Sequence, residues 1–120
     1  MKMDRGLSGK DRILKNVDYR RVLKGGRTYR EGVFVVGVYK SALKRHRLGI
    51  SISAKRVRLA TRRNRLRRLI KESFRINKIY YKKGYYDIVV ALAKTPDAKL
   101  SFQAVNGIMG SLLKKAGVME

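Results

Sequence analysis

Residues 62–77 read RRNRLRRLIKESFRIN. At 100° per residue, its apolar side chains form one stripe and polar side chains gather on the opposite side. The stripe is Leu66, Leu69, Ile70 and Phe74, and the opposite side is Asn64, Arg68, Lys71 and Arg75. The spacing predicts an amphipathic helix from Arg62 to about Asn77, with its apolar side against a core.

Strand signals lie on both sides of this helix. Before it, a β-branched and aromatic run is followed by a polar turn and then by apolar residues alternating with small ones. After it, a loop from Tyr80 to Gly84 leads into a run with the buried-looking centre Ile88-Val89-Val90. The predicted strands are Val33 to Tyr39, Leu48 to Ile52 and Tyr85 to Leu92.

Two further helices are predicted toward the ends of the chain. The first is capped by Asn16 or Asp18 and ends at Gly25-Gly26. One face of this helix carries Tyr19, Val22 and Leu23. The last helix is capped by Ser101, and its apolar residues keep helical spacing as far as Ala116.

The order of elements is therefore helix, strands, helix, strand, helix. This order favours a single-domain α/β sandwich over residues 1–120, with the helices packed on a small mixed sheet. Residues 1–12 are interpreted as a flexible basic arm of that domain.

The charge of the chain is one-sided, because 31 Lys and Arg face 8 Asp and Glu and leave a formal net charge of +23. Such a surplus destabilises the fold by self-repulsion unless a polyanion cancels it. Nucleic acid is the first choice of polyanion and an anionic membrane the second. The chain has no cysteine, no secretory signal pattern and no apolar run of about 20 residues, so we expect a cytoplasmic protein that does not enter a membrane.

Catalytic groups are hard to find in this sequence. The single histidine, His46, lies in a basic turn between Arg45 and Arg47 and is interpreted as a solvated loop residue. The eight acids are scattered singly, and Glu72 is most simply a salt-bridge partner within its helix. We therefore expect neither a catalytic residue nor a metal site in the protein.

The informative stretch for binding is residues 54–75, which hold ten Lys and Arg and one acid. A merely solvated helix face normally mixes charges of both signs. Here Arg63, Arg67 and Lys71 repeat one sign at a spacing of four residues, which is repulsive. Most of these residues are arginines, whose planar forks grip phosphate, so the pattern indicates contact with RNA or DNA.

A family resemblance agrees with this interpretation. Residues 62–72, RRNRLRRLIKE, closely resemble the RNR signature of the bacterial ribonuclease P protein subunit. Residues 47–51 (RLGIS) and 84–90 (GYYDIVV) resemble the family's strands before and after the signature, and residues 18–23 (DYRRVL) resemble its N-terminal helix. The resemblance covers about residues 10–117.

The resemblance implies a subunit that assists the endonucleolytic removal of the 5′ leader from precursor tRNA. Its partners would be the catalytic ribonuclease P RNA and the leader, with no protein partner implied. Catalysis and the catalytic magnesium ions would belong to the RNA, and the protein would bind no cofactor itself. The resemblance also implies a rare left-handed crossover between residues 47 and 92, where a right-handed one is the default.

The family's site residues carry over position by position. The positions expected to face the RNA are Arg62, Arg63, Asn64, Arg65, Arg67, Arg68, Lys71, Arg75, Lys55 and Arg56. The positions expected in the leader cleft are Tyr19, Leu23, Ser51 and Ser53. Tyr19 would stack on a base, with a role in the helix core as the alternative. Ser51 and Ser53 lie opposite the apolar side of their strand, where small side chains leave room for a nucleotide.

Two positions depart from the family pattern. Leu23 stands where a second aromatic is common, which leaves stacking there open. Residues 53–61 are one residue longer than in the family, with Lys55-Arg56 in place of a Lys-Lys pair and without a glycine. The conformation of this loop and the roles of its basic pair stay open.

Three other classes of protein share some of these features. A ribosomal protein would have similar charge but would need no leader cleft. A bacterial DNA-packaging protein would carry β-arms with an apolar wedge, a pattern that the sequence lacks. A basic membrane-surface helix would match residues 62–77 alone, but the flanking strands favour burial of their apolar side in a core.

Overall fold

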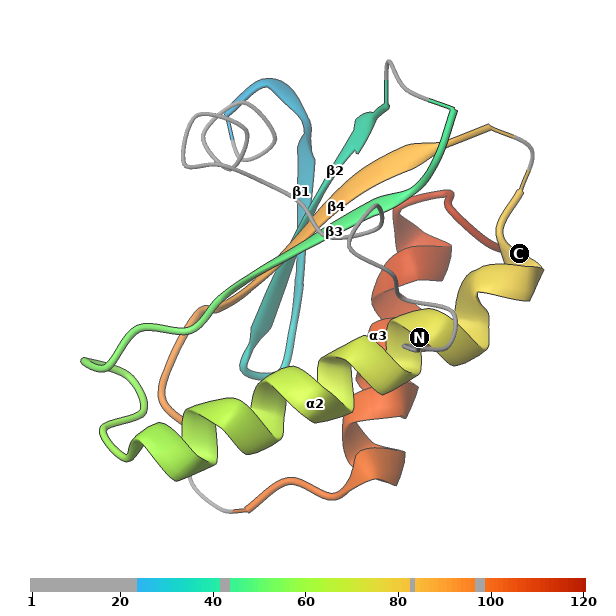
Figure 1. Cartoon of the computed structure of the whole chain (residues 1–120). Helices are drawn as coiled ribbons and strands as arrows, with labels where there is room; N and C mark the ends of the chain where they lie inside the picture. Colours follow the sequence, from blue (N-terminus) through green and yellow to red (C-terminus); the bar gives the residue numbers. More distant parts are fainter. Residues whose placement is uncertain (1–23, 42–43, 83, 97–98) are drawn as a thin grey trace.

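The computed structural model describes residues 24–41, 44–82, 84–96 and 99–120. Four strands form one sheet in the order β1-β2-β4-β3, and helices pack on it, which confirms the predicted α/β sandwich (Figure 1). The described elements are β1 (Arg27–Glu31), β2 (Phe34–Lys40), β3 (Arg47–Ser51), α2 (Ala60–Asn77), η1 (Lys78–Tyr80, a 3₁₀ turn), β4 (Tyr86–Leu92) and α3 (Phe102–Lys115).

The sheet is mixed, as expected. β1 and β2 form an antiparallel hairpin in which Glu31 pairs with Phe34 and Gly32 turns the chain with φ 61°. β4 lies between β2, to which it is antiparallel, and β3, to which it is parallel. The parallel neighbours β3 and β4 are joined through α2, and the left hand of this crossover stays a prediction from the resemblance.

The core lies between the sheet and the two helices α2 and α3, which cover the same side of the sheet (Figure 1). Leu66, Ile70 and Phe74 of α2 are buried and Leu69 is half-buried, as the helical periodicity predicted. They meet alternate residues of the central strands, and the fully buried members of this core include Phe34, Val36, Ile88, Val105 and Leu112.

Strand β1 was not predicted from the sequence. Its residues, RTYRE, carry three charges, which normally count against a strand. β1 is an edge strand with one neighbour, and charged side chains are tolerated at a sheet edge. Tyr29 is the residue of β1 that packs against the core, so the apolar alternation was too weak to detect.

The predicted helix ends are largely confirmed. The hydroxyl oxygen of Ser101 accepts a hydrogen bond from the Ala104 amide at 3.1 Å and caps α3. α2 begins at Ala60, two residues before the predicted start. The first predicted helix was expected to end at Gly25-Gly26, and Lys24 and Gly25 are helical whereas Gly26 is not. The rest of that helix and the basic arm lie outside the described residues.

The chain after α3 folds back onto the segment after η1. Gly117 (φ 78°) ends α3, and the Val118 amide donates to the Leu113 carbonyl at 2.9 Å, the pattern of a Schellman motif. Met119 then forms a bridge with Tyr81, and the Lys82 amide donates to the Val118 carbonyl at 2.7 Å. None of the helices in the described ranges is long and apolar enough to cross a membrane.

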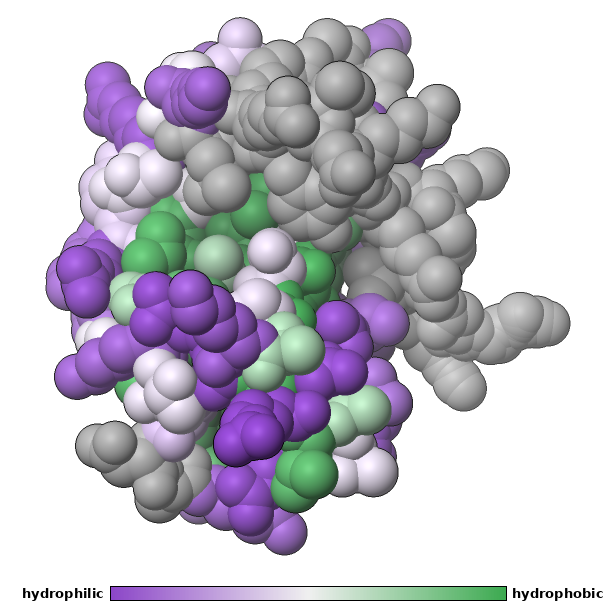
Figure 2. Space-filling model, turned by 90° about the vertical axis from the view of Figure 1, so that its left-hand side faces the viewer, coloured by the Kyte–Doolittle hydropathy of each residue, from purple (hydrophilic) through white to green (hydrophobic). Residues whose placement is uncertain are grey.

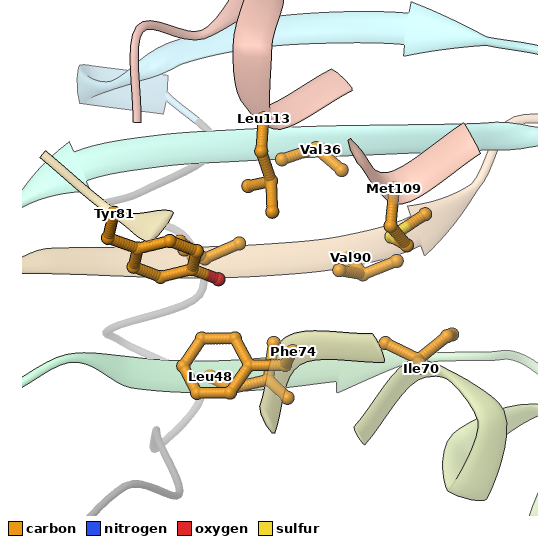
Figure 3. A pocket seen from close by; sticks show the side chains of 9 residues that line it. Val36, Leu48, Ile70, Phe74, Tyr81, Val90, Met109 and Leu113 are labelled. Carbon is orange, nitrogen blue, oxygen red and sulfur yellow. The ribbon is translucent and has the colours of Figure 1, made fainter. Parts of the chain in front are cut away.

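A small cavity of about 10 Å³ lies in the core between the sheet, α2 and α3 (Figure 3). Its lining is apolar except for the Tyr81 hydroxyl, which is buried and has no hydrogen-bond partner in the described part of the chain. Burial raises the pKa of this hydroxyl well above its ordinary value, because the charged form is poorly solvated there.

Candidate nucleic-acid interface

The basic residues of α2 lie on the sides of the helix that face away from the core. Figure 2 views the molecule from the side on which α2 begins and shows hydrophilic residues around a narrower hydrophobic strip. Arg62, Asn64 and Arg68 are exposed, and Arg63, Arg65, Arg67, Lys71 and Arg75 are partly exposed. Lys55 and Arg56 are exposed in the turn that precedes α2. The predicted RNA-binding residues therefore share one connected part of the chain.

Arg63 organises the loop whose conformation the sequence left open. Its Nη1 donates hydrogen bonds to the carbonyls of Val57 and Arg58, each at 2.9 Å. The loop turns tightly at Ser53, whose carbonyl accepts from the Val57 amide at 3.0 Å and whose hydroxyl accepts from the Arg56 amide at 3.2 Å. Val57 is buried in the hydrophobic core, so the middle of the longer loop is anchored.

Arg65 and Arg67 also make internal hydrogen bonds. Arg65 Nη1 donates to the Leu100 carbonyl at 2.6 Å and so ties α2 to the segment before α3. Arg67 Nη1 donates to the Asn64 side-chain oxygen at 3.1 Å. Arg65 is half-buried and its side chain holds main chain, whereas Arg68, predicted on the side opposite the apolar stripe, is exposed.

Glu72 is a salt-bridge partner within its helix, as predicted. It pairs with Arg75, whose Nε donates to the Glu72 carboxylate at 3.0 Å. This hydrogen bond holds the pKa of Glu72 below its ordinary value and raises the pKa of Arg75. The pair is partly exposed, so its contribution to stability is small, and the Glu72 carboxylate offsets part of the charge of Arg75.

We call the side of the sheet that faces away from α2 and α3 the rear face. The strand register assigns its residues, because side chains alternate along each strand. The register aligns Tyr39 with Asp87 and Arg47 in one row, Gly37 with Val89 and Gly49 in the next, and Val35 with Ala91 and Ser51 in the third. On the β1 edge, Thr28 pairs with Gly37 and Arg30 with Val35.

The rear face has small residues in its middle and larger polar residues at its margins. Gly37 and Gly49 flank Val89, and all three residues are buried, Val89 with none of its surface exposed, so the accessible part of the rear face is its margins. Ser51 is exposed on the β3 edge, and Arg30 is exposed on the β1 edge. Ser51 lies opposite the apolar side of its strand as predicted, since Leu48 is buried on the core side, but Ser53 does not share that strand, because β3 ends at Ser51 and Ser53 belongs to the turn that follows.

A buried ion pair closes one end of the rear face. Arg47 holds Asp87 through two hydrogen bonds, from Nε at 2.9 Å and from Nη2 at 2.8 Å, and Asp87 is fully buried. The sequence indicated only an isolated acid at Asp87, and this pair was not predicted. Arg47 is the first residue of β3 and Asp87 the second residue of β4, and these two strands are parallel neighbours.

The interpretation of His46 as a solvated loop residue is wrong. Its ring is half-buried among three tyrosines, with centroid distances of 4.9 Å to Tyr81, 5.4 Å to Tyr85 and 5.7 Å to Tyr86. Its Nδ1 accepts a hydrogen bond from the Tyr86 amide at 3.2 Å. The histidine therefore joins the start of β3 to the start of β4, which its neighbours in the sequence did not indicate.

Two of the predicted leader-cleft residues, Tyr19 and Leu23, lie outside the described residues. Across the described ranges, His, Cys, Asp and Glu side chains do not gather in groups of three or more that could hold a metal ion. The described residues place a basic helix on one side of the sheet and, on the other side, a rear face whose margins carry exposed Thr28, Arg30 and Ser51.

The sequence profile of the family described as Ribonuclease P matches residues 7–117. The chain belongs to the ribonuclease P protein family. Members of this family are the protein component of a tRNA-processing ribonuclease. Its relatives include the ribonuclease P protein component of Clostridium kluyveri, 41% identical over 110 residues that make up 91% of this chain and 96% of that protein. The component from Clostridioides difficile is 35% identical over 106 residues, 88% of this chain and 91% of that protein.

Solved structures of the family have the same fold. The Staphylococcus aureus RNase P protein superposes with a TM-score of 0.79 at 31% identity, covering 92% of this chain and 98% of that one. The RNase P protein from Thermotoga maritima gives a TM-score of 0.75 at 34% identity, covering 87% of this chain and 96% of that one.

Proposed function

We propose that this ribonuclease P protein binds the catalytic RNA through the basic side of α2 and binds the 5′ leader of precursor tRNA across the rear face. The observation that carries the proposal is the division of exposed polar side chains between the two sides of the sheet: arginines on α2 on one side, and hydroxyl and cationic side chains at the margins of the rear face on the other. The first feature suits phosphates and the second suits an unpaired strand.

In this proposal the protein supplies no catalytic group. The catalytic magnesium ions belong to the RNA subunit, and the protein's positive charge lowers the repulsion between that RNA and the precursor. Arg68 and Arg62, which are exposed, are the residues best placed to pair with phosphates of the RNA subunit. Arg63 and Arg65 have a second task, since their hydrogen bonds to main-chain carbonyls fix the loop and the helix from which the others project.

The margins of the rear face suit single-stranded RNA for two reasons. Ser51 and Thr28, both exposed, offer hydroxyl groups that hydrogen-bond sugars or bases. Arg30 at one margin supplies a cation for the backbone. The stacking of Tyr19 on a leader base remains part of the proposal.

The test is reconstitution with a ribonuclease P RNA at low magnesium, followed by cleavage and binding of precursor tRNA. Cleavage that depends on the protein separates this proposal from a ribosomal or DNA-packaging role. Ser51→Leu then places a larger side chain on the rear face at an exposed position. We expect it to weaken binding of precursor tRNA while affinity for mature tRNA is unchanged.

Gln103→Leu is the matched control, because it introduces the same side chain at an exposed position of α3 on the other side of the sheet. It should affect neither ligand. Equal losses of affinity for precursor and mature tRNA in Ser51→Leu would show that the rear face does not hold the leader.

A further inference from the structure

Aromatic and apolar side chains are exposed at one end of the molecule. Five large hydrophobic side chains are exposed in the described ranges, and four of them are considered together. Tyr39 lies near the end of β2 and Tyr85 directly before β4, with 37% and 44% of their surface exposed, and Ile79 and Tyr80 lie in η1, with 80% and 61% exposed. The fifth, Leu59, precedes α2. We call these four residues the tyrosine platform.

Specific contacts bring the platform together from distant parts of the chain. Lys40 at the end of β2 pairs with Tyr86, and the Ser41 amide donates to the Tyr85 carbonyl at 2.9 Å. Tyr80 ends η1, and the next residue, Tyr81, packs its ring edge-on against His46. His46 also contacts Tyr85, so its ring links Tyr85 to Tyr81, the neighbour of Tyr80 in the chain.

The platform is surrounded by positive charge. Lys40, Lys44, Arg45 and Lys82 are exposed in the same segments, and Lys78 is half-exposed in η1. Glu120 is the acid beside Tyr80 and Lys82, with which it lines a shallow depression. Exposed aromatic rings among lysines are the arrangement by which proteins bind unpaired nucleotides, with the rings stacking on bases and the cations pairing with phosphates.

We propose that the tyrosine platform binds unpaired RNA nucleotides, specifically the part of a long 5′ leader that extends beyond the rear face. This inference rests on the proposed function. Tyr39 connects the two sites, because it lies in the row of Asp87 and Arg47 that closes the rear face. α2 begins at the other end of the sheet, after Ser51, so a leader that leaves the catalytic RNA near α2 and crosses the rear face arrives at Tyr39.

Other occupants fit the charge less well. A second copy of this chain would bring another +23, and its approach to this lysine-rich end is repulsive. A folded protein partner would need an acidic surface with pockets for tyrosine. An anionic membrane is the remaining alternative, and binding to lipid vesicles tests it directly.

The experiment uses holoenzyme reconstituted from the full chain and a ribonuclease P RNA. Two precursor tRNAs are compared, one whose leader is a few nucleotides long and one whose leader is about three times longer. In Tyr80→Ala/Tyr85→Ala, affinity for the long leader should fall about fivefold or more, since a stacked ring contributes at least about 1 kcal/mol per base. Affinity for the short leader should be unchanged. Tyr80→Phe/Tyr85→Phe should keep the affinity for both, because phenyl rings also stack.

The controls separate the possible failures. Lys94→Ala removes an exposed charge just after the opposite end of β4, and it should affect long and short leaders alike. If Ser51→Leu weakens both precursors but the platform variant weakens neither, the proposed function stands and the platform inference is wrong. If the platform variant weakens both equally, the tyrosines contact the RNA subunit or the body of the tRNA and not the distal leader.

A second measurement tests the proposal even where the alanine variants do not fold. The chain contains no tryptophan, so Tyr80→Trp and Tyr85→Trp each introduce a single fluorescent reporter. Stacking on a base should quench this fluorescence when the long-leader precursor is added to the holoenzyme, and the short-leader precursor should not. Quenching by anionic vesicles in place of long-leader RNA would assign the platform to membranes and overturn the proposal.

Discussion

The guanidinium group of Arg65 donates a hydrogen bond of 2.6 Å to the main-chain carbonyl of Leu100, which precedes α3. A residue of the RNA-binding signature therefore also holds the two helices in position. We expect Arg65→Ala to lower the free energy of unfolding by about 1–2 kcal/mol, because a charged hydrogen bond to a partly buried carbonyl is lost. Chemical denaturation of the free protein measures this.

Arg68→Ala is the matched comparison. Arg68 is exposed, and its loss should leave the free energy of unfolding nearly unchanged. It should weaken binding to the catalytic RNA and reduce the slope of log affinity against log salt by about one, as expected for one phosphate contact. If the free energy of unfolding falls equally in both variants, Arg65 and Arg68 do not have the separate structural and RNA-binding roles assigned to them.

A buried polar cluster joins α2 to α3 and can be tested in the free protein. The Ser73 hydroxyl donates to the Asn106 side-chain oxygen at 2.7 Å, and Asn77 Nδ2 donates to the same oxygen at 3.1 Å. Asn106→Ala removes the shared acceptor and should cost about 1–3 kcal/mol of stability, since Ser73 and Asn77 are buried. Alanine favours helix more than asparagine does, so a measured loss is attributable to the cluster. Gln103→Ala, at an exposed position of α3, should change stability little.

The Tyr81 hydroxyl is expected to destabilise the protein. It is buried beside an apolar cavity with no hydrogen-bond partner among the residues described (Figure 3). Tyr81→Phe removes the desolvated group and keeps the ring that packs on Phe74 at 5.8 Å, so the melting temperature should rise. A lower melting temperature would mean that the hydroxyl is hydrogen-bonded in solution, for example to a water molecule in the cavity.

Glu31 gives the protein one source of acid sensitivity. Its carboxylate accepts from Lys115 at 2.8 Å and from the Ser111 hydroxyl at 2.6 Å, and these bonds lower the pKa of Glu31 from its ordinary value of 4.5. A lowered pKa in the folded state stabilises the fold above the ordinary value, and this stabilisation is lost as pH falls through the folded pKa. Glu31→Gln should therefore lower the melting temperature at pH 7, and the difference from wild type should shrink below pH 4.5. A difference independent of pH would exclude the carboxylate as its source.

The net charge predicts a strong response to polyanions. With +23 on one small domain, any anion that binds the folded form in preference to the unfolded chain stabilises it by mass action. Micromolar polyphosphate or short RNA should raise the melting temperature, whereas chloride at matched ionic strength should raise it less. Sulfate is a weaker test, since it also strengthens apolar burial in general. A melting curve unmoved by polyphosphate would show that the basic side of α2 is not a preformed anion site.

The helix 60–77 was predictable because its signal is local. Apolar residues at 66, 70 and 74 determine one buried side whatever the rest of the chain does. The same holds for the cap at Ser101, where the signal and the contact lie within one turn. The bounds of elements whose own sequence has a strong periodicity were therefore predicted to within about two residues.

The features that were missed depend on strand pairing, which no local pattern encodes. Arg47 meets Asp87 only because β3 and β4 are parallel neighbours in one particular register. His46 enters an aromatic cluster for the same reason, and β1 is a strand because β2 offers it an edge. The candidate RNA-binding arginines were named correctly as a basic group, but their separate contacts follow from the loop and from the segment before α3.

The position of β4 between β2 and β3 constrains how the protein is made. The ribosome synthesises β1, β2, β3 and α2 before it synthesises β4, the strand that pairs with both β2 and β3. Until Leu92 has emerged, a nascent chain can form a hairpin and a helix but has no sheet to connect them, and β3 has no partner strand. The central row of the rear face, Gly37, Val89 and Gly49, therefore forms only after β4 has been synthesised. A chain that stops before β4 lacks this row but already contains the arginine-rich segment of α2.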